Sequence, residues 1–507
     1  MKISARPLSL AFIGTVLAAG LTACGGGGGS SDSPAKQWGL VPSASVANIC
    51  AAPRNGLDPN TGRAYTDRAG TLNDEKTWVR SWIDETYLWY SEVPTNLVAS
   101  SYATPQDYFA DLKTPAKTAS GQPKDRFHFT QDTATWDDFI KGAASASYGM
   151  EIAVLQASPP RDIRVAYVAP NGPAGLAGVA RGDKLITLDG VDVATGPAGP
   201  LNAALDPSRV GETHAMVVAP VSGGQRSVAL TAASFTQPPV MNVKVISTGT
   251  GPVGYLQFND HIDPAEFQLI DAIQRFKNAG VNGLVLDMRY NGGGLLGIAS
   301  ELAYMVAGPA ATTGRTFERL IFNNKNPYGF TAAQTTFPFQ PTTLGYSVTA
   351  GQPLPYLGLS KVTVLAGPDT CSASESVVNS LRGIGVQVDL VGNTTCGKPY
   401  GFYAEDNCGT TYFAINFQGV NAQGFGDYGD GMAPTCTVAD DFTHNLGDVN
   451  EARLAAALTL RAGGACPAPV SSSGSQKAGA ALVEAPYLRR DPAREIKRVD
   501  SLLQPRS

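Results

Sequence analysis

The chain has 507 residues, 43% hydrophobic and 16% charged, which is ordinary for a soluble protein with about three domains of ~150 residues each. Its formal net charge of −5 gives no reason to expect a nucleic-acid partner. The 56 glycines and 35 prolines indicate many turns and linkers.

The first residues are predicted to be an export signal and not part of the fold. Lys2 and Arg6 precede PLSLAFIGTVLAAGL, an apolar stretch that is short for a membrane span. The LTAC that follows, residues 21–24, resembles a bacterial lipobox. The resemblance implies cleavage before Cys24 and lipidation of its sulfur. A plain secretory signal with a chance cysteine is the alternative.

Residues 25–37, GGGGGSSDSPAKQ, form a flexible polar tether that strengthens the lipoprotein interpretation. Lipid on Cys24 would anchor an otherwise soluble body to a membrane surface. Gly25 stands where an aspartate would be the common inner-membrane retention signal. We therefore expect the periplasmic face of a bacterial envelope, with the outer membrane slightly favoured. Residues 1–23 are assigned to the signal peptide and 24–45 to the tether.

Six further cysteines, an even number in an exported chain, suggest disulfides. The expected pairs are Cys396–Cys408, which flank a short loop, and then Cys371–Cys436 and Cys50–Cys466. A zinc site is the rival interpretation, but no C-x-x-C or histidine-rich spacing supports it. We therefore predict no metal and no other cofactor.

Residues 46–135 are predicted to form a small N-terminal helical domain. Apolar and aromatic residues recur at spacings of three and four between residues 74 and 113, which indicates two amphipathic helices. Such an aromatic stripe is more often part of a core than a ligand site. Residues 120–129 are expected to be a connecting loop.

Residues 140–236 contain strand-like segments separated by glycine and proline. SYGMEI (147–152) and GPAGLAGVARGDKLITLDG (172–190) resemble parts of a PDZ domain. The resemblance implies that loop N–H groups bind the terminal carboxylate of a peptide while the adjoining strand pairs with that peptide. The residues expected to do this are Tyr148, Gly149, Met150, Glu151 and Ile152. A small β-domain without a ligand is the alternative.

Residues 237–466 alternate between strands and helices, which predicts an α/β domain. Strands are expected at 253–260, 281–290 and 361–367, and helices at 263–280, 295–308 and 372–385. The apolar runs in the last two strands are typical of a buried parallel sheet. Residues 467–507 are polar and small and are predicted to be disordered.

Three serines alternate in DTCSASESVV, residues 369–378, at the start of a predicted helix. Ser372 at the N-cap, with Glu375 three residues later, forms a capping box, which is a purely structural interpretation. Ser374 and Ser376 are then expected on the helix surface. The same position suits a nucleophile, because a helix N-terminus has free N–H groups and partial positive charge.

An oxyanion formed when Ser372 attacks a carbonyl needs backbone donors. Ala373 is expected to supply one N–H. The glycine turn in DMRYNGGGLL, residues 287–296, offers another, because glycine lets the backbone approach a substrate closely. Gly293 is the first choice and Gly294 the second. The turn also resembles a phosphate loop, but it lacks the Lys-Ser/Thr that would follow.

The general base is expected to be a lysine, because none of the four histidines lies near residues 369–378. Lys398 lies in NTTCGKPYGF, residues 393–402, a glycine-rich context poor in acidic partners. A lysine acts as a base only when burial or nearby positive charge lowers its pKa. A surface lysine is the ordinary interpretation; the alternative is a serine–lysine dyad with Ser372.

SASE at residues 372–375 and GK at 397–398 resemble the motifs of the carboxyl-terminal processing peptidases, and the resemblance extends over residues 74–460. It implies a crotonase- or ClpP-like α/β core with an inserted PDZ domain. It also implies Ser372 as nucleophile, Lys398 as base and Glu375 as a residue that assists the dyad. GDGMAPTCTV, residues 429–438, matches the family's late strand region.

Three features depart from the family pattern. The serine-to-lysine interval, 398 − 372 = 26, is one residue longer than usual, and Phe402 stands where many members have a glutamine. Cys371 beside the nucleophile is also unusual. A thiol nucleophile there is an alternative, although a disulfide suits an oxidising compartment better.

The sequence thus predicts an exported, lipid-anchored serine endopeptidase. Its expected partners are proteins or peptides with apolar C-termini, captured by the PDZ domain, and a membrane that holds the lipid anchor. The alternative is a catalytically silent periplasmic scaffold that binds peptides through the PDZ domain.

Overall fold

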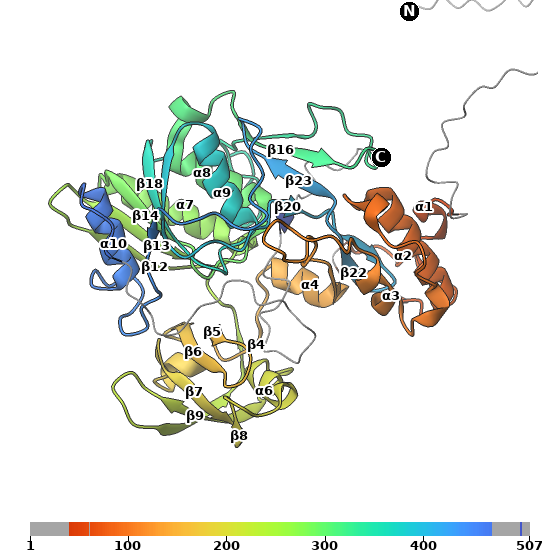
Figure 1. Ribbon diagram of the computed structural model, residues 1–507, viewed down its shortest axis with the longest axis horizontal. Coiled ribbons are helices and arrows are strands. Elements are labelled where there is room, and N and C mark those ends of the chain that lie inside the picture. The colour runs from red at the N-terminus through yellow and green to blue at the C-terminus, as the bar shows by residue number, and fades with distance from the viewer. Residues whose placement is uncertain (1–39, 60, 469–496, 499–507) are drawn as a thin grey trace, which may run out of the picture. The chain divides into compact units, whose positions relative to one another are not determined.

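The computed structural model describes residues 40–59, 61–468 and 497–498 (Figure 1). The predicted signal peptide, Cys24 and most of the predicted tail lie outside these residues. The described residues from Val41 onward belong to one compact unit. No described helix is both long enough and apolar enough to span a bilayer.

Two capped helices with an aromatic face dominate the N-terminal region. Its elements are α1 (Ser43–Val46), β1 (Ile49–Cys50), β2 (Arg68–Ala69), α2 (Leu72–Thr86), η2 (Tyr90–Glu92), η3 (Ala99–Ser101), α3 (Pro105–Asp111), β3 (Phe129–Asp132) and α4 (Thr133–Ile140). Thr71 and Thr104 cap α2 and α3 through reciprocal bonds with an aspartate three residues on. Trp78 and Trp82 stack on α2 with ring centroids 5.5 Å apart and are buried. The two predicted helices are confirmed, and their aromatic stripe is core.

Residues 145–235 form a β-rich region with its own apolar core. Its elements are β4 (Ser145–Ser147), β5 (Met150–Gln156), β6 (Asp162–Val168), α5 (Pro173–Leu176), β7 (Lys184–Leu188), β8 (Val191–Asp192), α6 (Ala198–Leu205), β9 (Thr213–Ala219), β10 (Arg226–Thr231) and β11 (Ala233–Phe235). The main sheet runs in the order β10-β9-β7-β6-β5. Strand β5 therefore has a paired neighbour on one side only.

A mostly parallel sheet forms the centre of the α/β region. Its elements are β12 (Val240–Ile246), β13 (Val253–Phe258), α7 (Asp263–Asn278), β14 (Gly283–Asp287), α8 (Leu296–Thr312), β18 (Lys361–Ala366), α9 (Ala373–Gly383), β19 (Gln387–Gly392), β24 (Cys436–Thr437) and α10 (Ala452–Arg461). The strand order is β12-β13-β14-β18-β19-β24, and only β12 runs antiparallel to its neighbour. The predicted α/β class and the predicted strands and helices of this region are confirmed.

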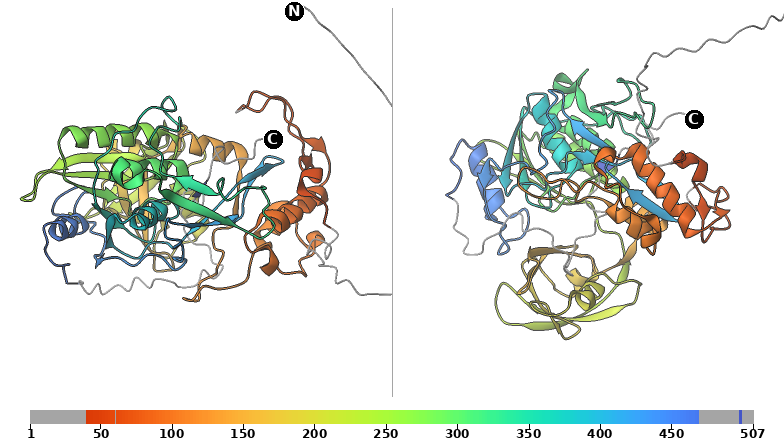
Figure 2. Two further views of the ribbon diagram at one scale, coloured as in Figure 1. Left: turned by 90° about the horizontal axis from the view of Figure 1, so that it is seen from above. Right: turned by 45° about the vertical axis from the view of Figure 1, so that its right-hand side comes forward.

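Both faces of this sheet are covered by helices, which explains its continuous apolar strands. Leu284 and Leu286 of β14 join the core that contains α7, α8 and α9, whereas Val285 between them packs with α10. Successive side chains of a strand point to opposite faces, so both faces need apolar residues. Figures 1 and 2 show α10 across the sheet from α8 and α9.

Smaller sheets connect this core to distant parts of the chain. They contain β15 (Gly294–Leu295), β16 (Thr316–Phe322), β17 (Thr336–Pro338), β20 (Tyr400–Gly401), β21 (Glu405–Asn407), β22 (Thr410–Phe413), β23 (Phe417–Val420) and β25 (Lys497–Arg498). One sheet runs in the order β17-β16-β23-β20, and β3 completes another, β21-β22-β3. Strand β25 pairs with β15. The prediction of a wholly disordered tail is therefore wrong at Lys497–Arg498.

The disulfide pairing differs from the predicted one at all three bonds. The bonds are Cys50–Cys408, Cys371–Cys396 and Cys436–Cys466. Cys371 and Cys396 follow the neighbouring parallel strands β18 and β19, whose carboxyl ends bring the two loops together; the Cys396 N–H donates to the Thr370 carbonyl at 3.0 Å. Proximity along the chain misled the prediction because strand order, and not loop length, decides which loops meet.

Candidate active site

The site lies where the loops after β14 and β18 meet at the carboxyl edge of the parallel sheet, the usual position of ligand sites in α/β proteins. The Cys371 N–H donates to the Asn291 carbonyl at 3.0 Å. The Thr370 hydroxyl donates to the Met288 carbonyl at 2.9 Å. These bonds hold the serine turn against the glycine turn.

Ser372 occupies a strained turn between β18 and α9. Its φ is +60° and its ψ is −115°, a backbone conformation that residues other than glycine rarely adopt. Such strain costs roughly 1–3 kcal/mol and is found mainly at functional sites. Its Oγ is buried and has no hydrogen-bond partner among the described residues. The predicted pairing of Ser372 with Glu375 at the start of α9 is present, and in it the Ser372 N–H donates to the Glu375 carboxylate at 3.0 Å.

Ser374 and Ser376 were expected on the helix surface, and this prediction is wrong. Both side chains are buried because α9 packs against α8, β16 and β19. The Ser374 hydroxyl donates to the Asn291 carbonyl at 3.1 Å, and that of Ser376 donates to the Ser372 carbonyl at 3.3 Å. Their hydroxyls brace the turn, which leaves Ser372 as the serine with an unbonded hydroxyl in this motif.

The Glu375 carboxylate links the serine turn to the lysine turn. Its Oε2 accepts the N–H groups of Ser372 at 3.0 Å and Lys398 at 2.8 Å. Its Oε1 accepts the Gly397 N–H at 2.9 Å and the Thr395 hydroxyl at 2.5 Å. Complete burial raises the pKa of Glu375, although these four donors act in the opposite direction. Glu375 thus positions both backbones of the predicted dyad.

Lys398 is 1% exposed, so the alternative of a surface lysine is excluded. Its Nζ lies 4.3 Å from the centre of the Phe402 ring and 4.7 Å from that of Phe127. Phe402, where a glutamine is usual in the resembled family, therefore offers the ammonium an aromatic face. Cation–π contacts of this kind are worth about 0.5–2 kcal/mol.

The Cys371–Cys396 disulfide is a second, covalent link between the serine turn and the lysine turn. It joins the residue before Ser372 to the residue two before Lys398, with their Cα atoms 5.1 Å apart. The two sulfurs and a Glu375 carboxylate oxygen lie within 4.8 Å of one another, a spacing that metal ligands also have. Because the sulfurs are bonded to each other, neither is available as a thiolate ligand or as a thiol nucleophile.

The predicted oxyanion donors differ in whether their N–H groups are already bonded within the protein. The Ala373 N–H lies in the first turn of α9, where N–H groups have no partner within the helix. The Gly293 N–H instead donates to Asn291 Oδ1 at 2.9 Å. Gly294, the second choice, follows with a φ of +129°, and a Cβ there would lie 2.3 Å from the His261 carbonyl oxygen. Gly294 is therefore restricted to glycine by both conformation and space.

Two residues that the sequence analysis did not select support these turns. His261 is fully buried, and its Nδ1 lies 3.1 Å from Asn291 Oδ1 and 3.2 Å from the Gly293 carbonyl. Burial lowers the pKa of His261 to about 3, so it stays neutral at physiological pH. Arg126 donates to the carbonyls of Cys396 and Gly397. The available signal for His261 was that it follows β13, the strand that pairs with β14.

The predicted peptide-binding residues of the β-rich region lie at the start of strand β5. Tyr148 is buried, and its hydroxyl donates to the Ala204 carbonyl of α6 at 3.2 Å. Gly149 has a φ of +68° and turns the chain into β5, which carries Met150, Glu151 and Ile152. These residues therefore occupy one edge of the sheet.

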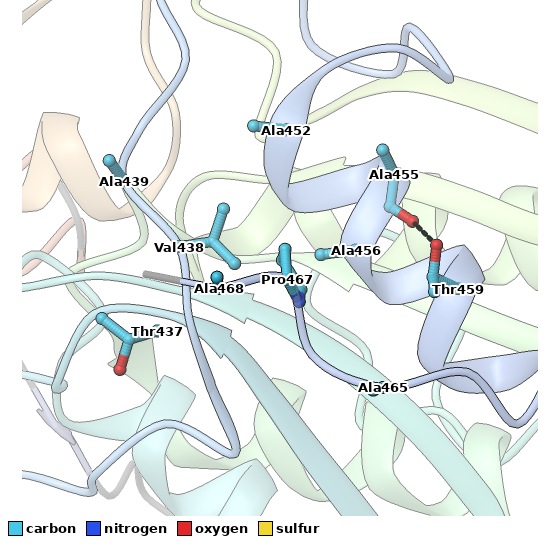
Figure 3. Close-up of a pocket in the computed structure, with 10 residues that line it drawn as sticks. All are labelled: Thr437, Val438, Ala439, Ala452, Ala455, Ala456, Thr459, Ala465, Pro467 and Ala468. Atoms are coloured by element: carbon cyan, nitrogen blue, oxygen red, sulfur yellow. Dashed lines mark hydrogen bonds between the residues drawn. The ribbon is translucent and has the colours of Figure 1, made fainter. Parts of the chain in front are cut away.

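A pocket beside α10 is separate from these groups (Figure 3). Its lining includes Val438, Ala456 and Thr459, and it contains no ionisable side chain. It lies on the α10 face of the sheet, whereas Ser372 begins α9 on the other face. The pocket therefore contributes nothing to the chemistry of Ser372 and Lys398.

Comparison with known proteins gives a family match for the segment that carries the site. Residues 252–401 match Peptidase family S41, and residues 74–129 match the Peptidase S41 N-terminal domain. Two segments of the chain, one of them carrying the site, therefore match domains of peptidase family S41. The first match contains Ser372, Glu375 and Lys398, and the second contains Arg126 and Phe127. The resemblance to the carboxyl-terminal processing peptidases is thereby confirmed.

The chain is 26% identical over 245 residues to a carboxyl-terminal-processing protease of Picosynechococcus sp. (48% of this chain, 53% of that protein). It is 28% identical over 257 residues to the chloroplastic C-terminal processing peptidase of Tetradesmus obliquus (48% and 51%). It thus spans about half the length of these relatives. The fold is shared with an S41 protease structure from Bacteroides fragilis at 22% identity and a TM-score of 0.59, covering 76% of this chain and 97% of that one.

Proposed function

We propose that this chain is a serine endopeptidase that cleaves peptide bonds with Ser372 as nucleophile and Lys398 as general base. The observation that carries the proposal is the shared Glu375 carboxylate. It accepts N–H groups from both residues and so fixes the strained serine turn relative to the buried lysine. The family match covers both residues and supports the same reaction.

In the proposed reaction, neutral Lys398 takes the hydroxyl proton as Ser372 Oγ bonds to the substrate carbonyl carbon. The Ala373 N–H and an N–H of the glycine turn stabilise the oxyanion. The C–N bond breaks, and the lysine returns the proton to the leaving amine. Water then hydrolyses the acyl-enzyme, releasing a carboxylate and restoring Ser372. The burial of both side chains keeps bulk water from the dyad.

We further propose that residues 140–236 act as a PDZ domain that delivers substrates. Strand β5 is a free edge preceded by a glycine turn, which suits pairing with an extended peptide and binding of its terminal carboxylate. Apolar C-termini are the expected ligands. Lipidation of Cys24 would anchor this enzyme at the periplasmic face of a bacterial envelope, as its LTAC motif suggests.

The test is hydrolysis of a labelled unfolded protein by the wild type and by Ser372→Ala and Lys398→Ala. Each variant is expected to lose at least about 10³-fold in activity, because the residues of such a unit act together. Ser380→Ala is the matched control, since Ser380 is another buried serine of α9 whose Oγ has no described partner.

A serine-directed covalent probe gives an independent readout. It is expected to label Ser372 in the wild type and in Ser380→Ala, but not in Ser372→Ala. Full activity in Ser372→Ala would refute the assignment of the nucleophile. An inactive, unlabelled wild type would indicate the silent peptide-binding scaffold instead.

A further inference from the structure

Two residues close to the end of the sequence lie against the glycine turn of the site. Lys497–Arg498 form strand β25, which pairs in parallel with β15: Gly294 is opposite Lys497, and Leu295 is opposite Arg498. Strand β15 directly follows Gly293 and precedes α8. The paired segment therefore runs beside the turn that is expected to hold the substrate carbonyl.

The hydrogen bonds of β15 show which of its groups face this segment. The His261 N–H donates to the Gly293 carbonyl at 2.9 Å, and the Leu295 N–H donates to the His261 carbonyl at 2.8 Å. Backbone groups of successive residues in a strand point to opposite sides. The N–H and C=O of Gly294 therefore point away from His261, toward β25.

Strand β25 also lies close to β20, Tyr400–Gly401, which begins two residues after Lys398. The segment is thus near both the strand that follows Gly293 and the strand that follows the lysine. Peptidases commonly bind a substrate as an added strand beside the catalytic groups, because main-chain pairing tolerates many side chains. The position of β25 meets this requirement with a backbone from the same chain.

We propose that the segment around Lys497–Arg498 is a substrate of this chain's own active site, and that the protein removes the residues that follow it. The inference rests on the proposed peptidase function and extends it to a specific substrate. Residues 469–496 lie between the core and the paired strand, so the sequence provides about thirty residues of connection, enough to span ~90 Å when extended.

The chemistry needs no reagent other than water. Ser372 Oγ forms an ester with the carbonyl carbon of Lys497 or an adjacent residue as the C–N bond breaks. The released amine takes the proton held by Lys398, and water then hydrolyses the ester. The products are a chain ending near residue 497 with a new carboxylate and a peptide with a new amino terminus.

The experiment compares intact masses of the full-length protein purified as wild type and as Ser372→Ala, followed over time. The wild type is expected to lose the mass of roughly the last ten residues, and Ser372→Ala is expected to keep it. Lys497→Pro/Arg498→Pro, which removes the N–H groups that a paired strand needs, is expected to slow the loss at least tenfold. Ala480→Pro, which places a proline in the connecting residues 469–496, is the matched control and is expected to be processed at the wild-type rate.

Each other result has a distinct meaning. A wild type that hydrolyses the unfolded protein substrate but keeps its last residues overturns the self-processing proposal and leaves the proposed function standing. Equal loss from the double-proline variant and from Ala480→Pro also overturns it, because recognition would not depend on the paired strand. A wild type that hydrolyses neither substrate overturns the proposed function itself.

Discussion

The Cys371–Cys396 disulfide is expected to support the geometry of the dyad beyond its effect on stability. The perturbation is Cys371→Ala/Cys396→Ala. The matched control is Cys436→Ala/Cys466→Ala, which removes a bond that holds the residues after β24 and does not border Ser372 or Lys398.

The two bonds have nearly equal entropic effects. Their cysteines are separated by 25 and 30 residues. Loop-closure entropy then gives about 3.5 kcal/mol of stabilisation for the first bond and about 3.6 kcal/mol for the second. Both double variants should therefore unfold at similarly reduced denaturant concentrations.

Activity should separate the two variants. Loss of Cys371–Cys396 frees the serine turn to move relative to the lysine turn, and a displacement of about 1 Å can lower a rate by about 100-fold. We expect that loss in the active-site variant and less than a threefold change in the control, measured on the unfolded protein substrate at a temperature where both are folded by circular dichroism. Equal activity in the two variants would refute the positioning role.

Three further outcomes are expected. Arg289→Met should lower the free energy of unfolding by about 3–5 kcal/mol, measured in urea, because it leaves the buried carboxylates of Asp287 and Glu451 without their cation; a change below 1 kcal/mol would contradict this. Glu375→Gln should lower stability by about 2–3 kcal/mol and also activity, because one amide end would face N–H donors; wild-type activity would argue against the bridging role. Because the pKa of His261 is lowered to about 3, the unfolded chain binds a proton below pH 6.5 that the folded chain does not, so folding stability falls on acidification. Between pH 7 and pH 5 the wild type should lose about 2 kcal/mol more than His261→Asn, and parallel pH dependences would count against a buried neutral histidine.

The sequence was sufficient for the parts of the site that are local in the chain. Apolar runs predicted the parallel strands, and the helix after β18 placed Ser372, Ala373 and Glu375 in one turn. Lys398 followed from its glycine-rich context and from the family motif. These features depend on short-range preferences, which a sequence carries directly.

The remaining features depend on which distant segments meet. The disulfide pairs were wrong because the strand order decides which loops are neighbours. Phe127 was missed because nothing in its local sequence shows that it packs against Lys398, and the available signal for His261 was its position shortly after β13. The burial of Ser374 and Ser376 was missed for a related reason: a helix covered on several sides needs small hydroxyl residues where the backbone approaches closely.

The pairing of β3 with β22 has a consequence for synthesis. Phe129 lies opposite Phe413, so β3 cannot pair with β22 until almost three hundred further residues have been synthesised. Arg126 and Phe127 precede that early strand and contact the loop of Lys398 and its ammonium. A ribosome that adds residues in order therefore cannot complete the lysine's surroundings until nearly the whole catalytic region has emerged. The growing chain therefore lacks the finished surroundings of Lys398 until β22 has emerged.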